Sequence, residues 1–300
     1  MMDVRSAPPF DPSSPVSLPA TMVGRPFGSD EAGRPVGRRK GSFIRATVEY
    51  MLECVARRAA AGVPPDAQTG AVTQAKAEAL EQLLTRINAA IPDPRYHVTV
   101  DYLMNEGHSY SVEFDTFMSH ICRELSGDPQ FHFNRGTRGT PASLVLLARP
   151  FSLSQTYRML PRFATKLADI DLRVGTVTPT SAVLQWHGDD DLARLPQALH
   201  RIFIEVDCQY MQGAFAAIPR LHSGSPMASV KELRCQLRGD PCCEWEFTWE
   251  TARNGRGPEM WGGAILSAAL LVYTLGRFPG WEWAAAATAL LPAWCGWLLW

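Results

Sequence analysis

The spacing of apolar residues changes near residue 170, and this change limits the possible folds more than any other feature of the chain. Before it, apolar residues recur at helical intervals in four segments, 43–55, 72–87, 114–125 and 159–167. After it, apolar and polar residues alternate in segments 170–175 and 182–186, as in strands with one buried face. Two more alternating segments, 233–237 and 243–249, flank a turn and predict a β-hairpin. Helices that precede an antiparallel sheet predict an α+β fold.

Two polar motifs predict where helices begin. Ser152 and Gln155 have the spacing of a capping box, in which the two side chains satisfy backbone N–H groups at a helix start. The run from Asp189 to Asp191 is typical of a helix N-terminus, and apolar residues follow it at helical spacing. We therefore expect one long helix over about 189–206, between the second strand and the hairpin.

The first forty residues are rich in Pro, Ser, Gly and Arg and lack apolar periodicity. Such a segment buries too little apolar surface to offset its ordering entropy, so residues 1–40 are predicted to form a disordered tail. Its basic end, which includes Arg38 and Arg39, is expected to be solvated, with contact to anionic lipid as the alternative. No secretory signal is visible, which favours a reducing compartment where cysteines are free, metal-bound or catalytic.

Charge and motifs exclude several classes of function. The formal net charge of −1 supplies no cationic field, so nucleic acid is not an expected partner. The sequence holds no GxSxG, P-loop, GxGxxG or HExxH motif, and its 7 histidines are scattered. These absences predict no catalytic activity within the 300 residues.

Two uncharged runs dominate the C-terminal part, 253–300. They predict a juxtamembrane link followed by two transmembrane helices, at about 260–276 and 283–300, with tryptophans near their ends. Arg253 and Arg256 precede the first run and Arg277 lies between the two, which favours a cytoplasmic N-terminal domain. Membrane lipid is therefore an expected partner. The alternative is a buried helical hairpin of a soluble domain.

Cysteines cluster in the predicted hairpin. On ideal strands Cys235 would face Trp245 and lie diagonal to Cys243, about 7–8 Å apart at the backbone, so their thiolates could share one metal ion. Cys242 has the opposite parity and should point away, and Cys208 could approach from the long helix. Glu232 could reach the site only through a bulge or a strand end. A metal site, plain core packing and a redox pair all remain open.

Three segments carry a family resemblance. The segments CQYMQG at 208–213, ELRC at 232–235 and GDPCC at 239–243 resemble the C-terminal half of the 4-vinyl reductase domain, a small-molecule-binding module of bacterial sensory proteins. The resemblance covers residues 41–252 and is best over 190–250. It implies an α+β fold shared with transport-particle subunits. It also implies a structural zinc ion, whose ligands would be Cys208, Glu232, Cys235 and Cys243.

The resemblance also implies a function. The chain would be a cytoplasmic sensory domain for bacterial signal transduction, anchored as a multi-pass protein in the inner membrane, with possible homodimerisation. Segments GSFIR at 41–45, GDPQF at 127–131 and LPRF at 160–163 look like N-terminal regions of membrane-bound signalling proteins. Alternatives are the N-terminal portion of a histidine kinase or nucleotide cyclase, or a scaffold that recruits partners. A small apolar ligand could bind between Trp186 and Trp245.

Overall fold

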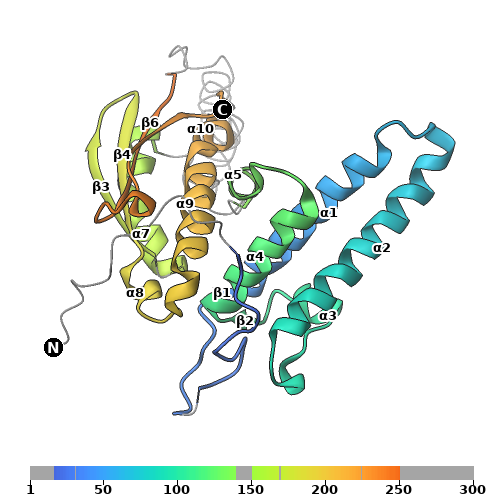
Figure 1. The fold of residues 1–300 in the computed structure, drawn as a ribbon. Helices are drawn as coiled ribbons and strands as arrows, with labels where there is room; N and C mark the ends of the chain where they lie inside the picture. The colour runs from blue at the N-terminus through green and yellow to red at the C-terminus, as the bar shows by residue number, and fades with distance from the viewer. Residues whose placement is uncertain (1–16, 31, 140–150, 169, 224, 251–300) are drawn as a thin grey trace, which may run out of the picture.

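The computed structural model describes residues 17–30, 32–139, 151–168, 170–223 and 225–250. Their fold is α+β, as predicted: antiparallel sheets pack against helices (Figure 1). The N-terminal half is mainly helical. Its longer helices are α1 (Gly41–Ala60), α2 (Pro65–Ala90) and α4 (Val112–Ser126). Shorter elements accompany them: β1 (Arg39–Lys40), η2 (Pro94–Tyr96), α3 (Val100–Leu103), β2 (Ser109–Tyr110) and α5 (Phe131–Gly136).

The C-terminal half contains a four-stranded antiparallel sheet with the order β3-β4-β6-β5. Its strands are β3 (Asp171–Val177), β4 (Ser181–His187), β5 (Ser229–Arg234) and β6 (Cys243–Thr248). Its helices are α7 (Leu153–Ala168), α8 (Asp189–Leu192), η3 (Gln197–Leu199), α9 (His200–Ala216), α10 (Ile218–Ser223) and η4 (Gln236–Arg238). In Figure 1, α9 runs between the sheet and the helical half, so it is the central element.

Aromatic residues join the sheet to its helices. Trp186 on β4 contacts Phe203 of α9, with ring centroids 5.9 Å apart. Tyr157 of α7 stacks on Trp249, which follows β6, at 4.6 Å. The side chains that alternate inward along β4 and β6 therefore meet both helices on one face of the sheet, as their period of two predicted.

The predicted capping box is confirmed. The Ser152 backbone N–H donates to the Gln155 side-chain oxygen at 2.8 Å, and the Gln155 N–H donates to the Ser152 hydroxyl at 3.2 Å. Two donors that the first turn of α7 cannot satisfy are thereby paired. The motif could be read from sequence because every group in it lies within four residues.

The predicted helix over 189–206 is wrong. The chain instead forms the short helix α8, the turn η3 and then α9, which begins at His200 and ends at Ala216. Pro196 separates them, because proline has no N–H to donate and disfavours helical backbone at the residue before it. Asp189, Asp190 and Asp191 lie in the first turn of α8 rather than capping a long helix.

The predicted disordered tail is corrected over the described part of residues 17–40, which we call the strap. The Met22 N–H donates to the Ala90 carbonyl at 2.7 Å, and the N–H groups of Val23 and Gly24 each donate to the Glu113 carboxylate at 2.8 Å. At its end, β1 pairs with β2. Backbone hydrogen bonds to the body supply the order that apolar periodicity does not predict; residues 1–16 lie outside the described residues.

The predicted membrane location needs correction. None of the helices in the described ranges is long and apolar enough to cross a membrane. The longest of them, α2, has 26 residues but carries charges along its length, including Lys76, Glu78 and Glu81. A multi-pass protein of the inner membrane is therefore not supported within these ranges. The spans predicted at about 260–276 and 283–300 lie outside the described residues.

Candidate metal centre

Three cysteines from distant parts of the chain meet beneath the sheet. Cys208 lies in α9, Cys235 follows β5, and Cys243 is the first residue of β6. Their Sγ atoms all lie within 4.8 Å of one another, and those of Cys235 and Cys243 are 3.9 Å apart. The three residues are 2%, 3% and 0% exposed. This buried cluster could bind a metal ion.

A β-bulge brings Cys235 to this place. Glu232 pairs with Trp245, and Arg234 pairs with the residue just before it in β6, Glu244, so β5 contains one extra residue. Leu233 occupies the extra position and is 39% exposed. The alternating pattern over 233–237 predicts that Leu233 and Cys235 share one face of a strand, and this prediction is wrong.

The bulge also corrects the predicted pairing and places Glu232. Cys235 directly follows Arg234, the last paired residue of β5, and its Sγ lies 3.9 Å from that of Cys243, closer than the predicted diagonal placement implies. Residues 232 and 235 now face the same side of the sheet, which an ideal strand would not allow. The Glu232 Oε2 atom lies 3.9 Å from Cys208 Sγ, at the edge of the cluster. The structure thus brings the three predicted cysteines together and places Glu232 beside one of them, Cys208.

The hydrogen bonds among the sulfurs determine where protons reside. Hydrogen bonds from Cys208 and Cys243 lower the pKa of the Cys235 thiol, so of the three sulfurs this one loses its proton most readily. The pKa of Cys208 is raised because its proton is held by Cys235 and Cys243. Burial raises the pKa of the Glu232 carboxyl. A divalent cation would displace these shared protons, as metal binding to thiols generally does.

The remaining described cysteines lie outside the cluster. All six described cysteines are free. Cys54 and Cys122 are buried in α1 and α4 as core residues, and burial raises the pKa of Cys122 to about 12. Cys242 is buried but does not belong to the three-sulfur group. Adjacent residues of an extended chain point to opposite sides, so Cys242 and its neighbour Cys243 have different surroundings.

The two tryptophans proposed for a ligand pocket fill the core. Trp245 is completely buried, and Trp186 is buried against Phe203. A shallow cavity of about 420 Å³ lies elsewhere, between the strap and the loop before β2, and its lining includes Phe27 and His108. Sequence reasoning did not identify this cavity.

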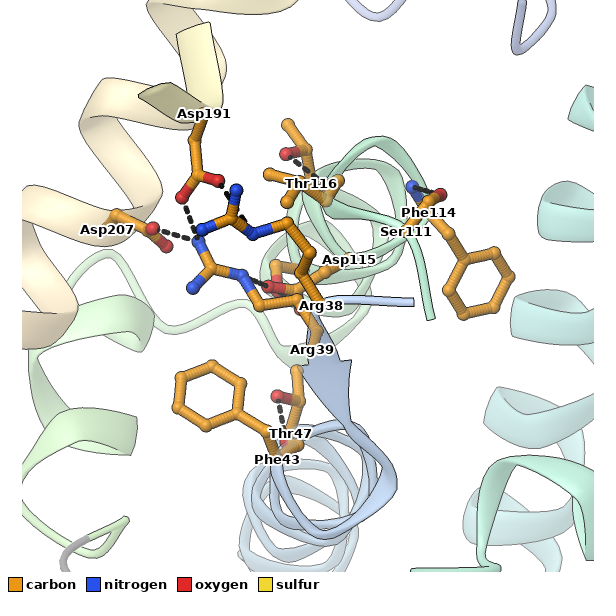
Figure 2. A network of polar contacts seen from close by, with 12 residues as sticks. Arg38, Arg39, Phe43, Thr47, Ser111, Phe114, Asp115, Thr116, Asp191 and Asp207 are labelled. Carbon is orange, nitrogen blue, oxygen red and sulfur yellow. Dashed lines mark hydrogen bonds and ion pairs between the residues drawn. The ribbon is translucent and has the colours of Figure 1, made fainter. Parts of the chain in front are cut away.

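Sequence reasoning also missed a buried ionic network around Arg39 (Figure 2). The Arg39 guanidinium lies 3.4 Å from Asp115 of α4 and 3.6 Å from Asp191 of α8, and it donates a short hydrogen bond to Asp207 of α9. Arg38 pairs with Asp191 at 3.7 Å. The network ties the strap to three helices. The prediction that Arg38 and Arg39 are solvated is therefore wrong.

Opposite charges within this network counteract the effect of burial on one another's pKa. Burial alone would lower the pKa of Arg39, but the three carboxylates raise it, so the guanidinium remains charged. Burial raises the pKa of Asp207 to about 6, although Arg39 opposes this shift. The cation occupies the space among the three carboxylates, so this network is a structural ion cluster.

The chain matches no family model, no curated protein and no solved structure. The resemblance to the 4-vinyl reductase domain therefore remains a prediction. Any functional proposal depends on the geometry of the described residues.

Proposed function

We propose that the chain is a non-catalytic sensory module whose core is held by a structural zinc ion. The ligands are Cys208, Cys235, Cys243 and Glu232. The observation that carries the proposal is the convergence of three buried sulfurs from α9 and the β5–β6 hairpin. Tetrahedral zinc with Zn–S bonds of about 2.3 Å places its sulfurs about 3.8 Å apart. Sulfurs already within 4.8 Å need only small shifts to reach that spacing.

The surroundings favour a metal over plain core packing and over a disulfide. Glu232 and Gln212 lie next to the sulfurs, whereas cysteines that act as small hydrophobic residues would have apolar neighbours. A disulfide needs an S–S distance of about 2.05 Å, and pairing two of the three would leave Cys208 or another thiol unpaired. Four protein donors in a buried place make a closed, structural site rather than a catalytic one.

The site offers a way to sense. Bound zinc would link α9 to β5, the edge strand of the sheet, so loss of the ion would release the end of that strand. A signal needs two states with different affinity for an input, and the metal-bound and metal-free hairpins are two such states. We therefore propose the metal state as the input. A small apolar ligand between Trp186 and Trp245 is disfavoured because both rings are buried.

Two neighbouring cysteines provide the test. The full chain is purified without chelators and its zinc is measured by mass spectrometry, alongside Cys243→Ser and the matched control Cys242→Ser. We expect about one equivalent in the unmodified chain and in Cys242→Ser, but less than about a tenth in Cys243→Ser. Circular dichroism reports whether each variant folds. A folded, unmodified chain that holds no zinc, even after zinc is added, refutes the proposal.

The proposed sensory role is tested by a separate measurement. Hydrogen exchange of the full chain is compared before and after zinc is removed by a chelator. We expect faster exchange over 229–250 on removal, with α1 and α4 unchanged. Equal exchange with and without zinc would show a static structural ion, and the sensory role would be refuted.

A further inference from the structure

The carboxylate of Glu232 is held from two sides by residues that are not ligands. Its Oε1 atom accepts a hydrogen bond from Arg238 Nη1 at 2.5 Å. Its Oε2 atom, the one nearer the sulfurs, lies 3.3 Å from Gln212 Nε2. Gln212 also contacts Cys208 Sγ at 3.4 Å. One oxygen is thereby fixed toward Arg238 and the other toward the cluster.

The backbone brings Arg238 to this position. Residues 236–238 form the turn η4, and Gly239 follows in the left-handed conformation with φ +85°. A residue with a Cβ rarely adopts this conformation, so the glycine allows the chain to reverse there. Within the same loop, the Asp240 carboxylate accepts the Cys235 N–H at 2.8 Å. The loop that supplies a ligand therefore also supplies the cation beside Glu232.

Charge gives Arg238 a second role. Three thiolates and one carboxylate carry four negative charges, so a bound Zn²⁺ leaves a net charge of −2 at the site. A guanidinium beside the carboxylate offsets part of this excess and lowers the electrostatic cost of holding four anions together. Outer residues that hydrogen-bond to a ligand also fix its orientation.

From this geometry we infer that Arg238 and Gln212 are positioning residues of the metal centre, and that Arg238 sets its affinity for zinc by holding Glu232 in the ligating orientation. The inference rests on the proposed zinc site. Both residues act through Glu232, Arg238 on Oε1 and Gln212 on Oε2. Neither supplies a ligand atom.

Arg234 is a matched control for Arg238. Both are arginines of the same hairpin with similar side-chain exposure, 55% and 53%. Arg234, however, pairs with Glu244 at 3.4 Å, not with a proposed ligand. A general loss of positive charge from the hairpin would affect both variants equally. An effect that acts through Glu232 should weaken zinc binding in the Arg238 variant and leave it unchanged in the Arg234 variant.

The test measures zinc affinity of the full chain by competition with a chromophoric chelator. We expect Arg238→Ala to weaken binding by about 10–100-fold, as outer-residue substitutions typically do, and Arg238→Lys to recover part of it. Arg234→Ala should stay within about twofold of the unmodified chain. Equal affinities for Arg238→Ala and Arg234→Ala would overturn the inference while leaving the zinc site intact. No zinc binding by the unmodified chain would instead refute the proposed function.

A second measurement distinguishes positioning from a general structural role. In a Glu232→Gln background the carboxylate is gone, so adding Arg238→Ala should change zinc affinity much less than it does in the unmodified chain. Cobalt(II) substitution gives an independent signature, because its visible spectrum reports ligand geometry. An Arg238→Ala effect of full size in the Glu232→Gln background would contradict the inference.

Discussion

His132 tests whether the fold keeps a buried titratable side chain in its neutral form. It lies in α5 and is 0% exposed, and neither ring nitrogen has a hydrogen-bond partner among the described residues. Burial lowers its pKa well below the ordinary value, and Arg135, Arg123 and His120 lower it further. The imidazole is therefore held neutral in the folded protein. Replacing it with leucine removes both the unpaired nitrogens and the titration.

The size of the effect follows from linkage. Because the folded-state pKa is lowered, protons bind the unfolded chain preferentially, and stability is lost as pH falls below about 6.5. Between about pH 7.5 and pH 5.5 this residue should cost the folded state about 1.4 kcal/mol. An unpaired buried polar group adds about 1–3 kcal/mol at any pH, so His132→Leu should be the more stable protein. Its advantage should widen by about 1.4 kcal/mol on acidification.

Urea unfolding of the full chain at the two pH values measures both the pH-dependent cost of the histidine and the pH-independent cost of its unpaired nitrogens. His132→Gln is the matched variant, because it abolishes the titration but keeps a polar group in the core. We expect His132→Gln to lose the pH dependence of stability, as His132→Leu does. At neutral pH, however, it should not be more stable than the unmodified chain. If the difference between His132→Leu and the unmodified chain is the same at both pH values, the histidine is not held neutral and the reasoning fails.

Three further substitutions test the packing, each by urea unfolding. Arg39→Met leaves buried carboxylates unpaired and should cost about 3–5 kcal/mol; a cost below about 1 kcal/mol would show that the network is solvated. Gly213→Ala should cost about 1–3 kcal/mol, because a Cβ there would lie 1.9 Å from the Phe133 carbonyl oxygen, and an unchanged stability would contradict that approach. Ser152→Ala removes one half of the capping box and should cost about 1 kcal/mol, whereas no loss would mean that the cap contributes nothing.

Local patterns predicted the parts of the fold that depend on local forces. The helices α1 and α4, the strands β3 and β4, and the Ser152 capping box all followed from residue spacing. Amphipathic period and cap chemistry act over a few residues, so they can be read directly. The cause of the wrong prediction at 189–206 is also local, because Pro196 lies within the segment and interrupts helical hydrogen bonding there.

Long-range polar pairing could not be predicted in this way. Arg39 meets Asp207 across 168 residues, and nothing in either segment marks the other as its partner. The strap is ordered by such pairings and by backbone hydrogen bonds, which leave no periodic signature. A low apolar content was therefore a poor guide to disorder here. The assumption that Arg38 and Arg39 are solvated failed for the same reason.

The candidate site could be predicted in composition but not in geometry. The sequence indicated Cys208, Cys235 and Cys243, and the resemblance added Glu232, which ideal strand geometry would have excluded. The bulge at Leu233 removes that conflict, but the hydrophobic pattern of β5 gives no indication of an extra residue. Arg238 was missed because its importance depends on the turn that returns it to Glu232.

Helix α9 joins these features, and its anchorage explains why metal should matter most at the hairpin. Successive helical residues point about 100° apart, so Asp207 faces Arg39 while Cys208 faces the sulfurs. On the side of α5, Gly213 allows close backbone contact. These contacts with the strap and α5 need no metal. The hairpin differs, because β5 is an edge strand paired only with β6 within the described sheet. A zinc ion would clamp the free end of that strand, so its loss should loosen the hairpin while α9 stays in place.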